Sequence, residues 1–124
     1  MFDIIVLYVG AGVITLWGVA HLIPSRSIVR GFGDISRDNR LIITMGWIAE
    51  GLALIFIGVL VFLVTYVAGP VNLGARIVYR LCFCMLVVMA VLSFFTGART
   101  SVIPMKVCPF VKLLVAASLV PSMV

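Results

Sequence analysis

Two ionisable side chains, His21 and Glu50, lie inside long apolar runs of the sequence. An ionisable group within a bilayer is expensive unless it is paired, and such groups commonly serve binding, proton transfer or catalysis. Glu50 follows Leu41, the start of the second apolar run, by about nine residues, which is about 14 Å along a helix and near the middle of a membrane. The sequence therefore predicts a polar site built around these two residues.

Side-chain direction predicts that His21 and Glu50 meet. Helical side chains lean toward the N-terminus of their own helix, and the two runs would cross the membrane in opposite directions, so the two polar heads converge. We expect a direct contact or one bridging water. The small residues around Glu50 indicate a face where helices approach closely: Gly46, Ala53 and Gly58. A purely structural pair that locks two helices together is the alternative to a binding, proton-handling or catalytic role.

Further polar and aromatic residues extend this predicted site. Ser93 belongs to a small polar stripe with Thr96 near the end of the third run, for which helix packing is an alternative role. Trp47 either caps the same site or lies at the membrane interface. Lys112 either joins the site or extends its ammonium group to the polar surface. The full set of candidates for ligand binding or proton handling is Glu50, His21, Ser93, Trp47, Arg40 and Lys112.

The three cysteines do not indicate a metal site. Cys82 and Cys84 are two positions apart, so on a helix they point about 200° away from each other. Cys108 precedes Pro109 at an expected helix start, with no histidine near it in the sequence. One histidine and three scattered cysteines do not make an ordinary zinc site, so we expect neither a metal nor a cofactor.

The composition sets the environment in which these residues act. The chain has 124 residues, of which 65% are hydrophobic and 10% charged, against about 45–50% and about 25% in soluble domains. A soluble globule and a disordered chain are both excluded, and a lipid bilayer is the expected partner. We expect an all-α, up-down-up-down bundle of four transmembrane helices in a single domain, residues 1–124, with helices at about 4–23, 41–67, 77–98 and 109–124.

Two boundaries of this bundle rest on particular residues. The first run opens with Met-Phe-Asp, without the basic segment of a signal peptide, so we expect it to be retained as a span. The last run is expected to start at Pro109, because proline is favoured at the first helical position.

The charges predict an orientation. Seven of the nine Lys and Arg residues fall on one side of the predicted membrane, against Arg76 and Arg80 on the other. The positive-inside rule places segment 24–40 in the cytoplasm and both termini outside, in the cell membrane of a prokaryote, and explains the charge better than nucleic acid, which we do not expect as a partner. Basic residues expected to set topology or bind lipid headgroups are Arg26, Arg30, Arg37, Arg99 and Lys106. Asp34 and Asp38 among them predict an ordered loop with internal ion pairs.

Three short motifs carry a resemblance to a known group. They are W-G-V-A-H-L-I-P at 17–24, T-G-A-R-T at 96–100 and C-P-F at 108–110. With the four expected spans, the chain resembles the DoxX-like group of small bacterial and archaeal membrane proteins. The resemblance implies an accessory membrane subunit, in some members beside quinone-linked redox enzymes. Small multidrug resistance transporters are similar in architecture, but their buried acid lies in the first span and Glu50 in the second.

These observations leave three functions open. The first is an accessory or ligand-binding subunit whose His/Glu site holds a small lipophilic molecule such as a quinone, or docks to a larger membrane complex or a second copy. The second is a proton-coupled transporter acting as a homodimer. The third is a membrane-embedded isomerase or reductase acting on a lipid. No motif of a nucleotide-binding, zinc-protease or serine-hydrolase enzyme is present in the sequence, so an enzyme is the less expected class.

Overall fold

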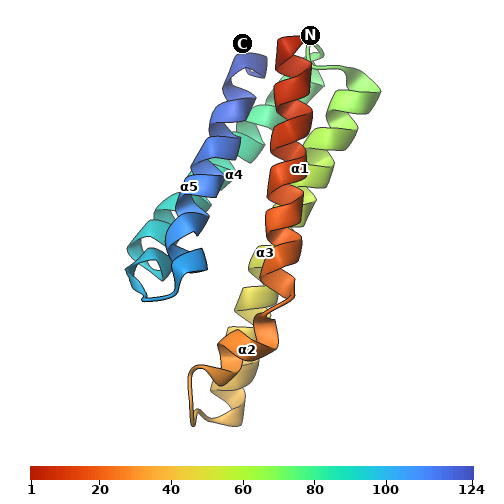
Figure 1. Ribbon diagram of the computed structural model, residues 1–124. Coiled ribbons are helices and arrows are strands. Elements are labelled where there is room, and N and C mark those ends of the chain that lie inside the picture. Colours follow the sequence, from red (N-terminus) through yellow and green to blue (C-terminus); the bar gives the residue numbers. More distant parts are fainter.

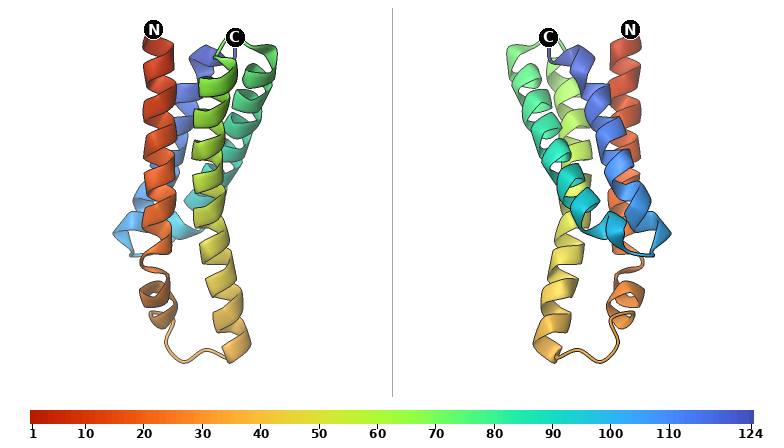
Figure 2. Two further views of the ribbon diagram at one scale, coloured as in Figure 1. Left: turned by 90° about the vertical axis from the view of Figure 1, so that its right-hand side faces the viewer. Right: turned by 90° about the vertical axis from the view of Figure 1, so that its left-hand side faces the viewer.

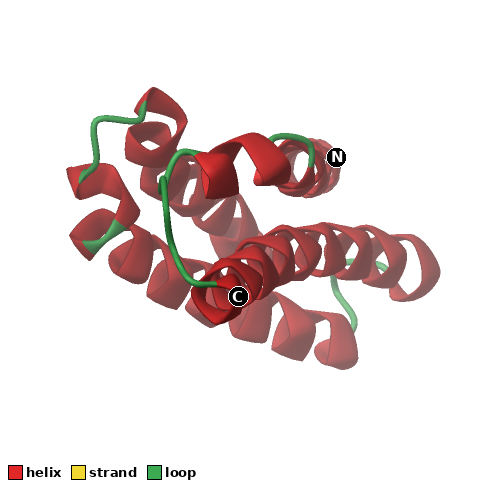
Figure 3. Ribbon diagram, turned by 90° about the horizontal axis from the view of Figure 1, so that it is seen from below, coloured by secondary structure: helices red, strands yellow, loops and turns green.

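The computed structural model describes residues 1–124, apart from the side chain of Phe2. Within that part of the chain the structure consists of helices and turns and contains no strand (Figure 3). Four helical stretches are long and apolar enough to cross a membrane: Asp3–Leu22, Arg37–Ala68, Leu73–Arg99 and Ile103–Ser122. The all-α prediction is therefore confirmed, and each predicted apolar run overlaps one of these stretches.

The long helices pack side by side (Figure 1). They are α1 (Phe2–Leu22), α3 (Arg37–Ala68), α4 (Leu73–Phe95) and α5 (Ile103–Leu119). Both termini lie at one end of the bundle, beside the turn between α3 and α4, and the short η2 (Val120–Ser122) lies there too (Figure 1). At the other end are α2 (Ser25–Arg30) and the 3-10 turn η1 (Gly97–Arg99). Figure 2 shows α2 and the first turns of α3 extending past the ends of α4 and α5.

A continuous apolar core runs between the four long helices. Fully buried side chains come from every one of them: Leu7, Ile14, Leu54, Leu86 and Leu119. The outward faces also carry large apolar side chains, such as Leu16, Phe56, Leu92 and Leu114, which are exposed. An apolar outer surface of this extent fits a lipid environment.

Glycines let α1 and α3 approach closely. A Cβ atom at Gly18 would lie 2.7 Å from the carbonyl oxygen of Gly51, and one at Gly58 would lie 2.7 Å from the carbonyl oxygen of Ala11. These are backbone atoms of the facing helix, which cannot move aside as a flexible side chain does. The close packing predicted from the small residues around Glu50 is therefore present at Gly58, although Gly46 has open space around it.

Polar caps make α3 and α4 start earlier than the sequence indicates. The Ser36 hydroxyl accepts a hydrogen bond from the Asn39 N–H at 3.2 Å, so α3 begins at Arg37 rather than at 41. The Asn72 side chain accepts from the Gly74 N–H at 2.8 Å, so α4 begins at Leu73 rather than at 77. Segment 24–40, expected to be a loop, contains α2.

The expected start of the last helix at Pro109 is wrong. Helix α5 begins at Ile103, and Pro104 occupies its first turn, where a missing N–H costs nothing. Pro109 lies inside the helix and is buried. Because proline has no backbone N–H, it cannot donate the usual helical hydrogen bond to the Met105 carbonyl four residues earlier. Cys108 consequently lies in the body of α5 and not at its N-terminus.

Candidate functional site

A buried ion pair joins α3 and α5. The Lys112 side chain is completely buried, at 0% exposure, and its ammonium Nζ contacts Oε1 of Glu50. It also donates to the Ser93 hydroxyl of α4 at 2.6 Å, and that hydroxyl donates to the Met89 carbonyl at 2.8 Å. The structure thus brings three of the candidate residues together. The alternative in which Lys112 reaches the polar surface is wrong, because its charge is met inside the bundle by a carboxylate.

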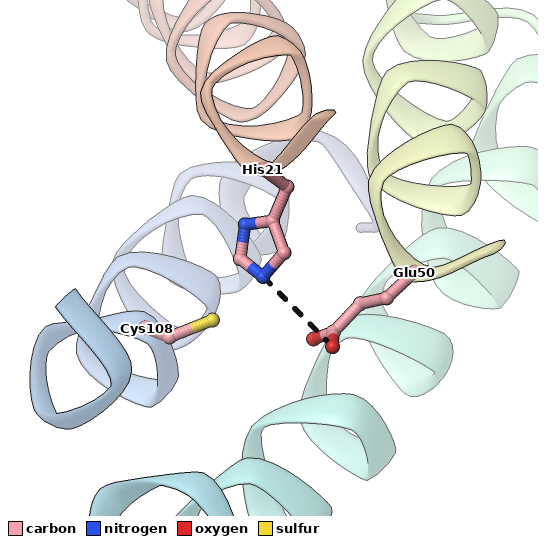
Figure 4. Close-up of side chains that lie close together, drawn as sticks. All are labelled: His21, Glu50 and Cys108. Atoms are coloured by element: carbon pink, nitrogen blue, oxygen red, sulfur yellow. Dashed lines mark ion pairs between the residues drawn. The ribbon is translucent and has the colours of Figure 1, made fainter. Parts of the chain in front are cut away.

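His21 completes this polar cluster from α1. Its Nε2 lies 3.9 Å from Oε2 of Glu50, in agreement with the expected contact (Figure 4). Trp47 of α3 stacks on the imidazole, with ring centroids 5.0 Å apart, and its indole N–H donates to the His21 carbonyl oxygen at 2.6 Å. Trp47 therefore belongs to the site, where it holds the histidine in place.

Cys108 is a member of the site that the sequence does not single out. The Trp17 indole N–H donates to its Sγ at 3.5 Å, and potential ligand atoms of His21, Glu50 and Cys108 all lie within 4.8 Å of one another (Figure 4). The start of α5 at Ile103 places Cys108 and Lys112 in the same helix. They are four residues apart and share one helix face, and this spacing is the sequence signal for Cys108.

The site lies near one end of the bundle. Glu50 is about 27 Å along α3 from its end at Ala68, close to the whole thickness of a bilayer core. It is level with His21 in the last turn of α1. Helix α3 runs for about 20 Å before it reaches Glu50, so the residue lies near the end of the packed bundle, and its depth in a membrane stays a prediction.

A cavity of about 300 Å³ adjoins the polar cluster. Most of its lining is apolar or aromatic, as with Ile28, Val102 and Met105. The lining also includes both tryptophans of the chain, Trp17 and Trp47. His21 also lines this cavity, so it is the residue that the cavity and the polar cluster share. A larger hollow between α1 and α5 has Ser118 as its one polar side chain.

Two other expected site residues lie elsewhere. Arg40 is exposed near the start of α3, about 15 Å along the helix from Glu50, and does not join the cluster. Thr96 is exposed and its hydroxyl donates to the Leu92 carbonyl at 2.7 Å. Both residues fall outside the site, because the polar cluster lies level with the last turn of α1 and these two residues lie beyond that level.

The basic residues of this end face outward. Arg26, Arg30, Arg37, Arg99 and Lys106 are all exposed. The predicted ion pairs of Asp34 and Asp38 are absent among the described side chains, where the ion pairs are those of Glu50. Ser36 and the helical fold of α2 order the segment instead.

The chain matches no protein-family model, no curated protein and no solved structure. The likeness to the DoxX-like group stays a resemblance. The chemistry open to the site follows from its groups: an imidazole, a thiol and an ammonium–carboxylate pair beside an aromatic cavity, which can donate hydrogen bonds, move a proton or ligate a metal.

Proposed function

We propose that the protein is an integral membrane protein with four spans running up-down-up-down, and that it binds a small lipophilic molecule with a polar ring, such as a quinone. Segment 24–40 and the turn at 96–102 face the cytoplasm in this proposal, and both termini face outside. Support comes from the four long apolar helices and from six exposed basic residues at the end that contains segment 24–40, against Arg76 and Arg80 at the other.

One observation carries the binding proposal: His21 lies between a buried polar cluster and a cavity walled by Trp17 and Trp47. Binding sites for small molecules are mostly apolar and aromatic with a few placed polar groups. About 300 Å³ is at the low end of their size range and suits a single ring. Flat aromatic walls suit a planar head group, and the imidazole offers it a hydrogen bond.

The ion pair favours binding over proton-coupled transport. A proton-coupled transporter needs an acid that alternates between its proton and its substrate, whereas Oε1 of Glu50 is held by the buried ammonium of Lys112. A role as a subunit of a larger membrane complex is compatible with ligand binding. Native mass spectrometry of the protein released from its own membrane tests that role, and a second polypeptide in the spectrum would support it.

Intrinsic fluorescence tests the binding proposal, because both tryptophans of the chain line the cavity. We expect a short-chain quinone to quench the emission of the detergent-solubilised protein with saturation. Ala20→Phe places a ring in the cavity and should weaken binding by about tenfold or more, close to 1.4 kcal/mol.

The matched control is Ala117→Phe, which adds the same ring to the larger hollow between α1 and α5. It should leave the quinone affinity unchanged. Quenching that rises linearly without saturation, or an equal loss of affinity in both variants, would overturn the proposal.

A further inference from the structure

We propose that His21, Glu50 and Cys108 form a binding site for a divalent transition-metal ion of the zinc class. The site shares His21 with the proposed ligand cavity, but it does not depend on that ligand. It reverses the expectation of no metal, which rested on how far apart these residues lie in the sequence.

The geometry of the three residues suits a small ion. They come from α1, α3 and α5, and one ligand atom of each lies within 4.8 Å of the others. His21 Nε2 and Glu50 Oε2 are 3.9 Å apart. Ligand atoms around a tetrahedral zinc lie roughly 3.3–3.8 Å apart, given bonds of about 2.0–2.3 Å. Small side-chain rotations therefore close the cluster around an ion, without movement of the helices.

An unpartnered atom points to a missing ligand. His21 is only 6% exposed, yet its Nε2 has no hydrogen-bond partner among the described side chains. Buried polar atoms are nearly always satisfied, and each exception needs an explanation. This nitrogen faces the Glu50 carboxylate and the Cys108 thiol, which is itself 3% exposed. A bound cation supplies the absent partner.

The donor set selects the kind of ion. A thiolate and an imidazole favour zinc and its transition-metal neighbours, whereas magnesium and calcium prefer oxygen ligands alone. Three protein ligands leave a fourth position open to water or a bound molecule. On binding, the Cys108 thiol would release its proton to the solution and coordinate as the thiolate.

The neighbouring groups orient these ligands without occupying them. Lys112 holds Oε1 of the carboxylate, which leaves Oε2 for the ion. The Trp17 N–H points at the Cys108 sulfur, where it stabilises negative charge, and Trp47 fixes the histidine. Hydrogen bonds of this kind to ligating groups are a regular feature of metal sites.

Cobalt substitution tests the proposal on the full chain in detergent. After treatment with a chelator, Co²⁺ added alone should bind once per chain, giving the visible bands of a tetrahedral ion and a near-ultraviolet thiolate-to-cobalt band. Cys108→Ser should abolish the near-ultraviolet band, and His21→Gln should weaken Co²⁺ binding by about tenfold or more. Cys84→Ser is the matched control, because Cys84 is exposed on α4, and it should change neither.

Circular dichroism identifies any variant that fails to fold, and the two ligand variants serve as independent checks. A folded wild-type chain without cobalt bands, or a near-ultraviolet band that survives in Cys108→Ser, would overturn the metal site. Ala20→Phe should keep the cobalt spectrum while losing quinone binding, so the two proposals can fail separately.

Discussion

Lys112 holds its charge in complete burial, and this residue dominates the energetics of the site. A buried ion pair adds little net stability, because desolvation offsets the attraction, but removing one partner leaves an uncompensated charge. The two partners differ in this respect. The Glu50 side chain keeps 31% of its surface exposed and has His21 beside it, whereas Lys112 has Glu50 as its counter-ion and no exposed surface.

This difference predicts an asymmetric mutant cycle. Glu50→Gln strands the buried ammonium and should lower the free energy of unfolding by about 3–5 kcal/mol. Lys112→Met should cost less, because Glu50 retains exposure and the methionine fills the same space. The double variant should recover most of the loss. Thermal unfolding in detergent measures all three, and equal losses in the two single variants would contradict the argument.

The contacts of a single residue were predictable from the sequence where its direction on a helix determined them. His21 and Glu50 are the ionisable groups of the first two apolar runs, and their opposite lean predicts that they meet, as they do. Cys108 was not predictable, because its partners lie on another helix, and one of them, Trp17, is 91 positions away in the sequence. The sequence identified Lys112 as a charged residue within an apolar run. It did not determine whether the ammonium joins the buried site or reaches the polar surface.

At the scale of elements, the glycine contacts between α1 and α3 position the site. Gly18 lies three residues before His21, and Gly51 follows Glu50 directly, so one of the two close approaches of these backbones is next to the polar pair. Helix ends were less predictable than helix faces. Ser36, Asn72 and Pro104 mark the starts of α3, α4 and α5, and none of these starts coincides with the start of an apolar run.

Adding one methyl group tests these contacts. Gly18→Ala and Gly58→Ala place a Cβ against the backbone of the facing helix and should destabilise the protein by about 1–3 kcal/mol. Gly12→Ala and Gly46→Ala, with open space around them, should leave stability unchanged or slightly raised. Unfolding temperatures in one detergent compare the four variants. A loss in the Gly12 and Gly46 variants as large as in the other two would refute the close approach.

At the scale of the whole molecule, the fold gathers its termini and the α3–α4 turn at one end and its basic segments at the other. Four apolar helices were predictable from composition and run length alone. The projection of α2 and the start of α3 past the bundle was not, because the polar residues there gave no helical signal of their own. Because of that projection, the site lies near the end of the packed bundle that carries most of the basic residues.

Cysteine labelling tests the proposed orientation. In a Cys84→Ser background, Val71→Cys in the α3–α4 turn should react with a membrane-impermeant maleimide on intact cells. Asn39→Cys, which is exposed at the start of α3, should react only after the cells are opened. The two remaining cysteines, Cys82 and Cys108, are buried and provide a low background. The reverse labelling pattern would invert the topology.

The site is divided between the two halves of the chain in a way that bears on how the protein is made. The strongest packing is within two helix pairs, α1 with α3 and α4 with α5. His21 and Glu50 belong to the first pair, and Ser93, Cys108 and Lys112 to the second. Because Glu50 precedes Lys112 by 62 residues, the carboxylate is synthesised well before its ammonium partner. A chain that stalls before α5 has His21 but not Lys112 beside this carboxylate, and the last helix alone brings the ammonium group.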